Sequence, residues 1–472
     1  MSDRTDGLRP TDLGPKKIRV LLERALALST TDETEVTYSG GEEALTRFSR
    51  NAIHQNVAEV DATLEIRAAL GTRVGSATTN TLTPDGIERA VQQVCELARH
   101  LPVNPEWLGL PAPQPLPDAP PTYDEAVAAL CADPEARARA VAEICAEAGG
   151  NKMLASGAFS TARNEYAILN SKGLFAYAAS TSVDLTFVVE QPEFSASSYA
   201  HASGWRLGQI DFESLKQQAI RQALAASRRF PRAISPGEYP VVLEPYAVLV
   251  LLEAMVEDGM GALAVQEERS WMNHHLGERC MSPKVFITDD ALDPEGFPRA
   301  FDCEGVPKQR VPIVVGGAPT TPVYDRVTAA REPGRASTGH AQPYDDEDWD
   351  GPLPENLIIT PGDQTVEAMI RSIDRGLYIN RFWYVRQTTP HNAAATGTTR
   401  DGVWWIERGE LAHPVNDLRF DQELVTALRG VRGVGRDLRT LFGFYGVHRL
   451  PALTLESFRF IGNGDGARGR SP

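Results

Sequence analysis

The sequence is short of basic residues relative to acidic ones. Its 472 residues include 47 Lys and Arg against 63 Asp and Glu, which gives a formal net charge of -16 at pH 7. Binding to nucleic acid depends on clustered Lys and Arg that contact phosphates, so this balance argues against a general affinity for DNA or RNA. We therefore expect no nucleic acid partner.

Long apolar runs are also absent. No stretch approaches the roughly 20 apolar residues that a helix needs to cross a bilayer. The polar segment Met1–Arg9 lacks the apolar core of a signal peptide. These absences argue against membrane and secreted proteins, and we expect a cytoplasmic location with no membrane partner.

Cysteine is scarce, with five residues and no CxxC spacing. An odd number of scattered cysteines in a cytoplasmic protein is typical of free thiols rather than of disulfides. Cys303 lies between Asp302 and Glu304, where neighbouring negative charge should raise the thiol pKa and lower its reactivity. The other four are Cys95, Cys131, Cys145 and Cys280.

Histidine is scarce as well, and local spacing does not arrange it as a metal site. His54 has no second His at ligand spacing, and the adjacent residues His274 and His275 would point in different directions on any regular element. The acidic segment 344–350 lacks the Gly and terminal Glu of an EF-hand, which favours a solvated loop. These local patterns predict no metal ligands in this chain.

The remaining composition, 42% hydrophobic and 23% charged, is that of a globular protein of two or three domains. Prolines between Leu101 and Thr122 exclude helix there and favour an extended linker. The periodicities around it predict an α+β fold, in which N-terminal and middle units of helices and antiparallel sheet precede a β-rich C-terminal domain. The predicted segments are a disordered leader (1–15), an N-terminal α+β domain (16–100), the linker (101–122), a middle α+β domain (123–230), the C-terminal domain (231–461) and a disordered tail (462–472).

Turn residues divide the predicted elements. Residues 34–39 alternate as a strand that Gly40 and Gly41 should end, and Asn170–Gly173 predicts a hairpin turn. A helix is predicted over 365–375, ending at Gly376. Sequence leaves open whether the N-terminal and middle units share one sheet or form two similar layers.

The stretch Glu238–Ser270 organises the C-terminal part. The extended apolar run 239–243 precedes a helix that is apolar on nearly every side until Glu257. This pattern predicts a buried helix behind a buried strand.

This strand and helix, followed by Val285–Asp290 and Phe301–Pro307, resemble the TldD/PmbA family of peptidase-related proteins. In active members the helix carries His-Glu-x-x-x-His, in which the His residues hold zinc and the Glu is general base to the bound water. The resemblance places Glu253 at the first His position, Ala254 at the Glu position and Asp258 at the second His position. None of the three motif residues is therefore present. Active members also carry a cysteine ligand in the C-terminal sheet, where this chain has none.

The resemblance implies the PmbA (TldE)-like branch, with no catalytic residue and no cofactor in this chain. Zinc is then expected in a TldD-type metallopeptidase subunit, and the heterodimer would cleave peptides or unfolded segments. Glu253 and Asp258 could in principle still offer oxygen ligands to a hard cation. The run Ser337, Thr338 and Gly339 resembles a family loop beside the cleft, which is either a peptide contact or a structural turn.

Two further interpretations remain. The chain could be a stand-alone peptide-binding or regulatory protein, or an enzyme with unrelated, amidase-like chemistry. No Ser, Cys or Lys constellation supports the second, and Ala254 argues against hydrolysis by the family's route because an alanine cannot accept a proton.

Overall fold

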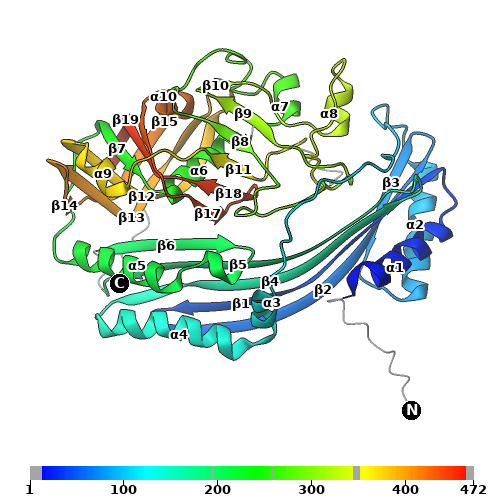
Figure 1. Cartoon of the computed structure of the whole chain (residues 1–472), viewed down its shortest axis with the longest axis horizontal. Coiled ribbons are helices and arrows are strands. Elements are labelled where there is room, and N and C mark those ends of the chain that lie inside the picture. The colour runs from blue at the N-terminus through cyan, green and yellow to red at the C-terminus, as the bar shows by residue number, and fades with distance from the viewer. Residues whose placement is uncertain (1–12, 193–195, 258, 344–350, 464–472) are drawn as a thin grey trace.

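A computed structural model describes residues 13–192, 196–257, 259–343 and 351–463. A long sheet with helices on one face lies beneath the C-terminal half of the chain (Figure 1). The first helix begins at Gly14, inside the predicted leader, whose residues 1–12 lie outside the described part. The acidic segment 344–350 and most of the predicted tail, residues 464–472, lie outside it too.

The N-terminal and middle units share one antiparallel sheet. Its six strands pair in the order β3-β2-β1-β4-β5-β6, and β1 pairs with β4 from Glu35 to Phe48. Sequence left open whether these units share one sheet or form two layers, and the structure has one sheet. The strands are β1 (Glu33–Ser49), β2 (Ala52–Leu70), β3 (Arg73–Thr79), β4 (Leu154–Asn170), β5 (Phe175–Glu190) and β6 (Ser197–Gly204).

Helices cover one face of this sheet because apolar and polar residues alternate along its strands, so that one face is apolar. Val36 and Tyr38 of β1 are buried under the first two helices, whereas Glu35 and Thr37 lie on the opposite face, toward the C-terminal half. The first pair of helices packs on one end of the sheet and the other three on the far end. They are α1 (Gly14–Leu28), α2 (Pro84–His100), α3 (Glu125–Ala132), α4 (Pro134–Gly150) and α5 (Phe212–Ser227), with the short helix η1 (Leu207–Gln209) before α5.

The predicted end of β1 at Gly40 and Gly41 is wrong. The strand continues through both glycines to Ser49, and both pair with residues of β2 and β4. A side chain at Gly41 would place its Cβ 2.6 Å from the carbonyl oxygen of Arg163 and would also overlap Asn164. These glycines permit close packing inside the sheet rather than a turn. The predicted turn at Asn170–Gly173 does join β4 and β5.

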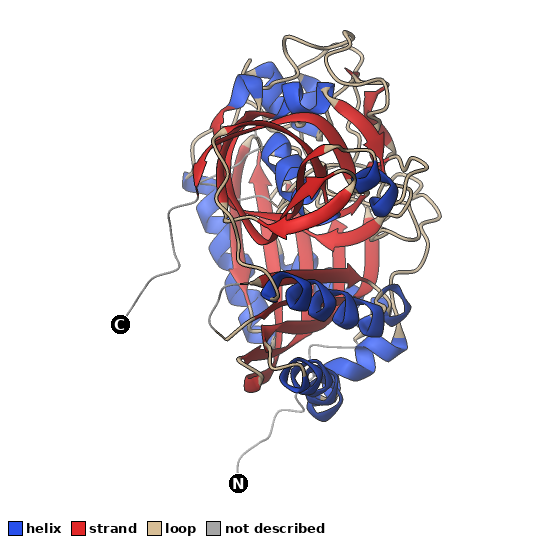
Figure 2. Cartoon of the chain, turned by 90° about the vertical axis from the view of Figure 1, so that its left-hand side faces the viewer, coloured by secondary structure: helices blue, strands red, loops and turns tan. Residues whose placement is uncertain are grey.

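The C-terminal half contains two sheets. In one, β12-β7-β19-β15-β13 form a ring, because β12 also pairs with β13, and curved strands of this half fill the upper part of Figure 2. The other sheet has the order β10-β9-β8-β11-β18-β17. The strands are β7 (Gly237–Leu243), β8 (Ile287–Asp289), β9 (Val311–Val315), β10 (Ala318–Pro319), β11 (Leu357–Ile359), β12 (Arg375–Thr389), β13 (Ala394–Glu407), β14 (Glu410–Pro414), β15 (Leu418–Glu423), β16 (Val431–Val434), β17 (Arg439–Phe442), β18 (Val447–Leu450) and β19 (Leu453–Asn463).

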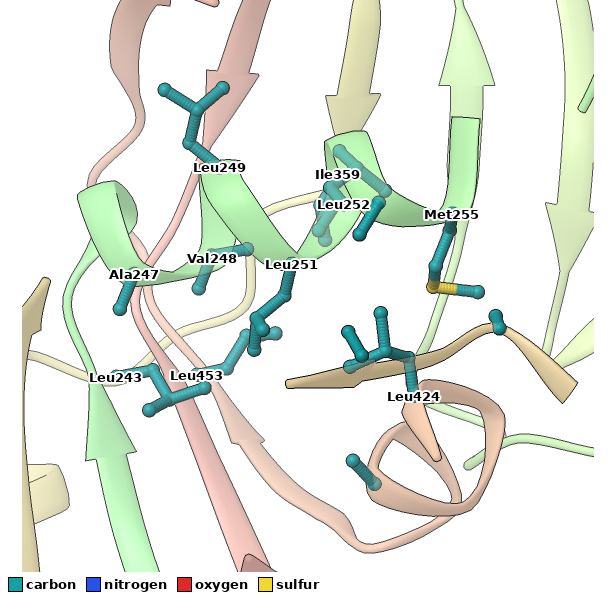
Figure 3. Packing of buried hydrophobic residues seen from close by; sticks show 14 of the residues in the cluster. Leu243, Ala247, Val248, Leu249, Leu251, Leu252, Met255, Ile359, Leu424 and Leu453 are labelled. Carbon is teal, nitrogen blue, oxygen red and sulfur yellow. The ribbon is translucent and has the colours of Figure 1, made fainter. Parts of the chain in front are cut away.

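Helix α6 (Pro245–Val256) lies between these sheets, as its all-round apolar sequence predicts. Ten of its 12 residues are buried. Figure 3 shows Val248, Leu252 and Met255 among Ile359 and other side chains from the surrounding strands. The remaining helices are α7 (Ala262–Gln266), α8 (Arg326–Ala330), α9 (Val366–Arg371), α10 (Leu424–Arg429) and η2 (Pro390–Asn392).

The helix predicted over 365–375 is shorter, because α9 ends at Arg371 and the backbone from Arg375 onward pairs with β13. Within the described ranges, no helix combines the length and the apolar character needed to span a bilayer.

Candidate functional site

Glu253 stands at the first motif position on α6, and its carboxylate holds a backbone turn. Its Oε1 atom accepts a hydrogen bond of 3.0 Å from the backbone N–H of Tyr445, and the backbone N–H of Phe444 contributes a second. These residues belong to the turn between β17 and β18. A side chain at Gly443 would overlap the Glu253 carboxylate, so the turn lies directly against it. Burial raises the pKa of Glu253, while the two N–H groups oppose that rise.

His448 of β18 is the histidine nearest to this carboxylate. Its ring is fully buried, and its Nδ1 accepts the backbone N–H of Leu357 at 3.2 Å. The Nε2 atom lies 3.9 Å from Glu253 Oε1, beyond hydrogen-bond distance. Burial lowers the pKa of His448 to about 4, so the ring is neutral at neutral pH, with its proton on Nε2.

The remaining motif positions add no ligand in the described part of the chain. Ala254 is buried, and its carbonyl oxygen accepts a 3.1 Å hydrogen bond from Gln387. Asp258 lies outside the described residues. In the ranges that the structure covers, no group of three or more His, Cys, Asp or Glu side chains is arranged to hold a metal ion.

The loop of Ser337, Thr338 and Gly339 is tied into the protein by its own hydrogen bonds. Thr338 Oγ1 accepts the N–H of Tyr324 at 2.8 Å and lies 2.9 Å from His340 Nδ1. Ser337 Oγ lies 3.2 Å from the Tyr324 carbonyl oxygen. Gly339 packs against the 301–307 turn, where a Cβ would lie 2.7 Å from the carbonyl carbon of Pro307. These contacts account for the loop as structure, and its contact with a peptide stays a prediction.

A cavity of about 330 Å³ lies between the exposed face of the long sheet and the C-terminal half. Cross-strand pairs of β1 and β2 supply part of its lining, since Glu35 lies opposite Arg67 and Thr37 opposite Glu65. Segments distant in sequence complete the lining, including Trp107 of the proline-rich segment, Tyr166 of β4, Cys303 and Glu304 of the 301–307 turn, and Asp325 and Arg326 at the start of α8.

Burial raises the pKa values of Glu304 and Cys303 in this cavity. The pKa of Glu304 rises to about 8, mainly through burial and secondly through the charge of Asp302, although Arg326 and Arg67 oppose the shift. The pKa of the Cys303 thiol rises to about 11, again mainly through burial. The expected direction for Cys303 is therefore confirmed, with burial rather than neighbouring charge as the largest cause. All five cysteines are free.

Sequence reasoning missed this cavity and its residues. The available signal was the period of two in residues 35–39 and 63–67, where polar side chains occupy the face opposite the apolar one. The same alternation is equally typical of a strand face that is exposed to solvent, so it does not by itself predict a cavity. Only the fold places the 301–307 turn and residues 104–109 over it.

Comparisons with known proteins decide the family. Residues 34–98 match the PmbA/TldA metallopeptidase domain 1, residues 116–226 the central domain and residues 236–462 the C-terminal domain. The chain belongs to the PmbA/TldD family. The resemblance inferred from the strand and helix at 238–270 is thereby confirmed.

Curated relatives in the PmbA/TldD family are described as metalloproteases. The metalloprotease PmbA of Escherichia coli O157:H7 is 25% identical over 444 residues, which are 90% of this chain and 91% of that protein. A metalloprotease of Methanothermobacter thermautotrophicus is 27% identical over 289 residues. That alignment covers 59% of this chain and 62% of the relative, so it spans less than two thirds of the archaeal protein.

A solved structure of the same family has the same fold. TldE from Thermococcus kodakarensis superposes with a TM-score of 0.83 and 20% identity, over 94% of this chain and 100% of that one. The predicted α+β class is confirmed by this likeness together with the three sheets described above.

Proposed function

We propose that this PmbA/TldD chain is the subunit without a metal in a heterodimeric metallopeptidase that cleaves peptides or unfolded polypeptide segments. Its partner would be a TldD-type subunit that carries the zinc ion and the catalytic residues. The observation that carries this proposal is the engagement of Glu253 with the Tyr445 backbone, with Ala254 beside it. The α6 helix is retained as a packing element, while Glu253 at its first motif position holds the backbone of a neighbouring turn.

The residues present around α6 do not fit a catalytic zinc ion. Such a site needs three protein ligands and an open position for water. Glu253 already accepts two backbone N–H groups, and His448 Nδ1 accepts a third. Ala254 cannot serve as general base to a bound water. We therefore derive no catalytic step in this chain, and assign the chemistry to the partner.

An unpaired strand edge supports a role in holding an extended peptide. β2 pairs with β1 along its length, but its pairing with β3 begins only at Leu64. Over residues 52–63, no strand in the described ranges pairs with the other edge of β2. Backbone groups on such an edge can bind an extended peptide as an added strand. Substrate, or a strand of the partner subunit, would bind there in the cytoplasm.

The state of the Cys303 thiol speaks against a cysteine-based form of the amidase-like alternative. Cys303, the one cysteine that is not fully buried, has a pKa of about 11, so almost all of it is the thiol at neutral pH. The proposal is tested by mixing the chain with a TldD-type subunit and measuring mass by light scattering and zinc by elemental analysis. We expect a complex with zinc bound by the partner alone. Stoichiometric zinc in this purified chain would contradict the proposal.

A further inference from the structure

A second cavity, of about 280 Å³, lies between the long sheet and the C-terminal half, and we call it the polar cavity. It adjoins the first cavity, which we call the acidic cavity because five Asp and Glu side chains line it, and Tyr166 of β4 lines both. The floor of the polar cavity is the face of β4 and β5 that points away from the helices. Its roof comes from the segments 297–301, 355–356 and 446–447.

Uncharged polar side chains form part of this floor. Asn164 of β4 lies directly opposite Ser180 of β5, and Tyr166 follows on the same face of β4. None of these three side chains forms a hydrogen bond with the described residues. All three are partly exposed. Their hydrogen-bonding groups are therefore open to a ligand in the cavity.

The roof adds a buried amide. Asn356 is 5% exposed, and its Nδ2 atom has no hydrogen-bond partner among the described residues. The backbone N–H of Asn356 donates to Asp289 Oδ2 at 2.7 Å, which fixes the residue in the cavity wall. A buried amide nitrogen without an acceptor is costly, so an added carbonyl oxygen is favourable here.

The charged residues of the lining are paired with each other. Arg299 Nη1 lies 3.3 Å from Glu355 Oε1, and Lys308, which is outside the lining, lies 2.6 Å from the other Glu355 oxygen. The charge of Lys308 also acts on the buried carboxyl groups of Asp289 and Asp302. Among the described residues, the lining therefore offers no unpaired charge. A charged ligand would lose its hydration there without gaining a partner.

A peptide backbone has the chemistry that this lining can bind. Each peptide group carries one donor and one acceptor, and the carboxamides of Asn164 and Asn356 also carry both. Phe297, Phe301 and Val447 supply apolar walls for small aliphatic side chains. The volume of about 280 Å³ suits a segment of about one or two residues.

We propose that the polar cavity binds an uncharged peptide segment, with Asn164, Tyr166 and Ser180 as hydrogen-bond partners in the floor and Asn356 in the roof. The choice of a peptide over another uncharged ligand rests on the proposed function in peptide cleavage. Binding is measured on this chain alone, whereas the proposed function is measured on its complex with a TldD-type subunit. Failure of one is therefore distinguishable from failure of the other.

Matched probes test the proposal by ligand-observed saturation-transfer NMR titration of the full chain. N-acetyl-alanyl-alanine amide is the neutral probe. Alanyl-alanine amide carries an ammonium group on the same backbone, and N-acetyl-alanyl-alanine carries a carboxylate. We expect the neutral probe to bind roughly tenfold or more tightly than either charged one, because burial of an unpaired charge is costly. Methyl glucoside, an uncharged ligand without a peptide group, should bind more weakly than the neutral probe.

Variants connect binding to this cavity. Tyr166→Phe removes only a hydroxyl group and Asn164→Ala a carboxamide, so each should weaken the neutral probe roughly three- to tenfold. Tyr384→Phe is the matched control, because this tyrosine is 68% exposed and outside the lining. Glu59→Gln, an exposed residue of β2 outside both linings, is a second control. Both controls should bind as the native chain does, and thermal unfolding shows whether each variant is folded.

Four results would overturn the proposal. They are equal or tighter binding of a charged probe, equal or tighter binding of methyl glucoside, no binding of the neutral probe, and undiminished binding by folded Tyr166→Phe and Asn164→Ala proteins. If a complex with a TldD-type subunit still forms and cleaves peptides, any of these results leaves the proposed function standing.

Discussion

The carboxylate of Glu253 accepts the backbone N–H of Tyr445 at 3.0 Å, across 192 residues of sequence. This bond joins α6 to the turn between β17 and β18. The family resemblance of residues 238–270 implies that active members carry a zinc-binding His at the corresponding helix position. Here the position holds the turn in place, which gives Glu253 a structural function.

Replacing Glu253 should loosen this turn. Glu253→Ala removes the acceptor of two backbone N–H groups and should cost about 1–3 kcal/mol. Hydrogen exchange of the peptide covering 443–446 should then become faster, by roughly 5- to 150-fold if local opening governs it. Glu253→Gln keeps an oxygen acceptor and is the matched control, expected to exchange nearly as slowly as the native chain. Equal exchange in the alanine and native proteins would show that Glu253 does not hold the turn.

His448 should make the protein less stable in acid. Its folded pKa of about 4 lies below the usual 6.5, so the unfolded chain binds more protons between these values. Stability from this group is present above pH 6.5 and is lost as the pH falls through 4, at about 1.4 kcal/mol per pH unit within the window. His448→Asn can still accept the Leu357 N–H but does not titrate. Its thermal midpoint should decline less steeply from pH 6.5 to 4, and parallel curves would contradict the assignment.

Glu304 should have the opposite effect on stability. Its folded pKa of about 8 exceeds the usual 4.5, so the folded chain binds more protons between these values. Its contribution to stability therefore falls as the pH rises from about 4.5 to 8. Glu304→Gln removes the titration, and its advantage in thermal midpoint over the native protein should grow across that range. Glu59→Gln should follow the native curve, and a constant difference for Glu304→Gln would argue against the shifted pKa.

Cys303 should react slowly despite its partial exposure. A thiol with a pKa of about 11 is almost entirely protonated at pH 8, and alkylation requires the thiolate. We expect iodoacetamide to modify Cys303 on the order of 100-fold more slowly than a free cysteine at that pH. Mass spectrometry of the peptide that contains Cys303 measures the rate. Rapid modification at neutral pH would identify an activated thiol and revive the amidase-like interpretation.

Local sequence patterns predicted the elements with strong periodicity. The strand β7 and the helix α6 follow from an apolar run bounded by turn residues, and Asn170–Gly173 forms its predicted hairpin turn. The glycines at 40 and 41 misled the prediction, because glycine marks turns and also permits close packing inside a sheet. Which role applies depends on Arg163 and Asn164, more than 120 residues away.

The two candidate sites also differ in how far the sequence could predict them. Position 253 could be identified from the helix pattern and the family resemblance, but its contact with the turn at Tyr445 depends on the fold. The acidic cavity was not predictable, because it joins Glu35, Trp107 and Glu304 from three distant segments. No local spacing relates these residues, and each one alone fits an ordinary surface position.

Peptide cleavage tests the central claim most directly. This chain alone, a TldD-type subunit alone and the two mixed are assayed on the same unfolded polypeptide, with bound zinc measured in each sample. We predict cleavage by the mixture only, with zinc in the TldD-type subunit. Cleavage by this chain alone would contradict the account, because Glu253 and Ala254 would then belong to a working site.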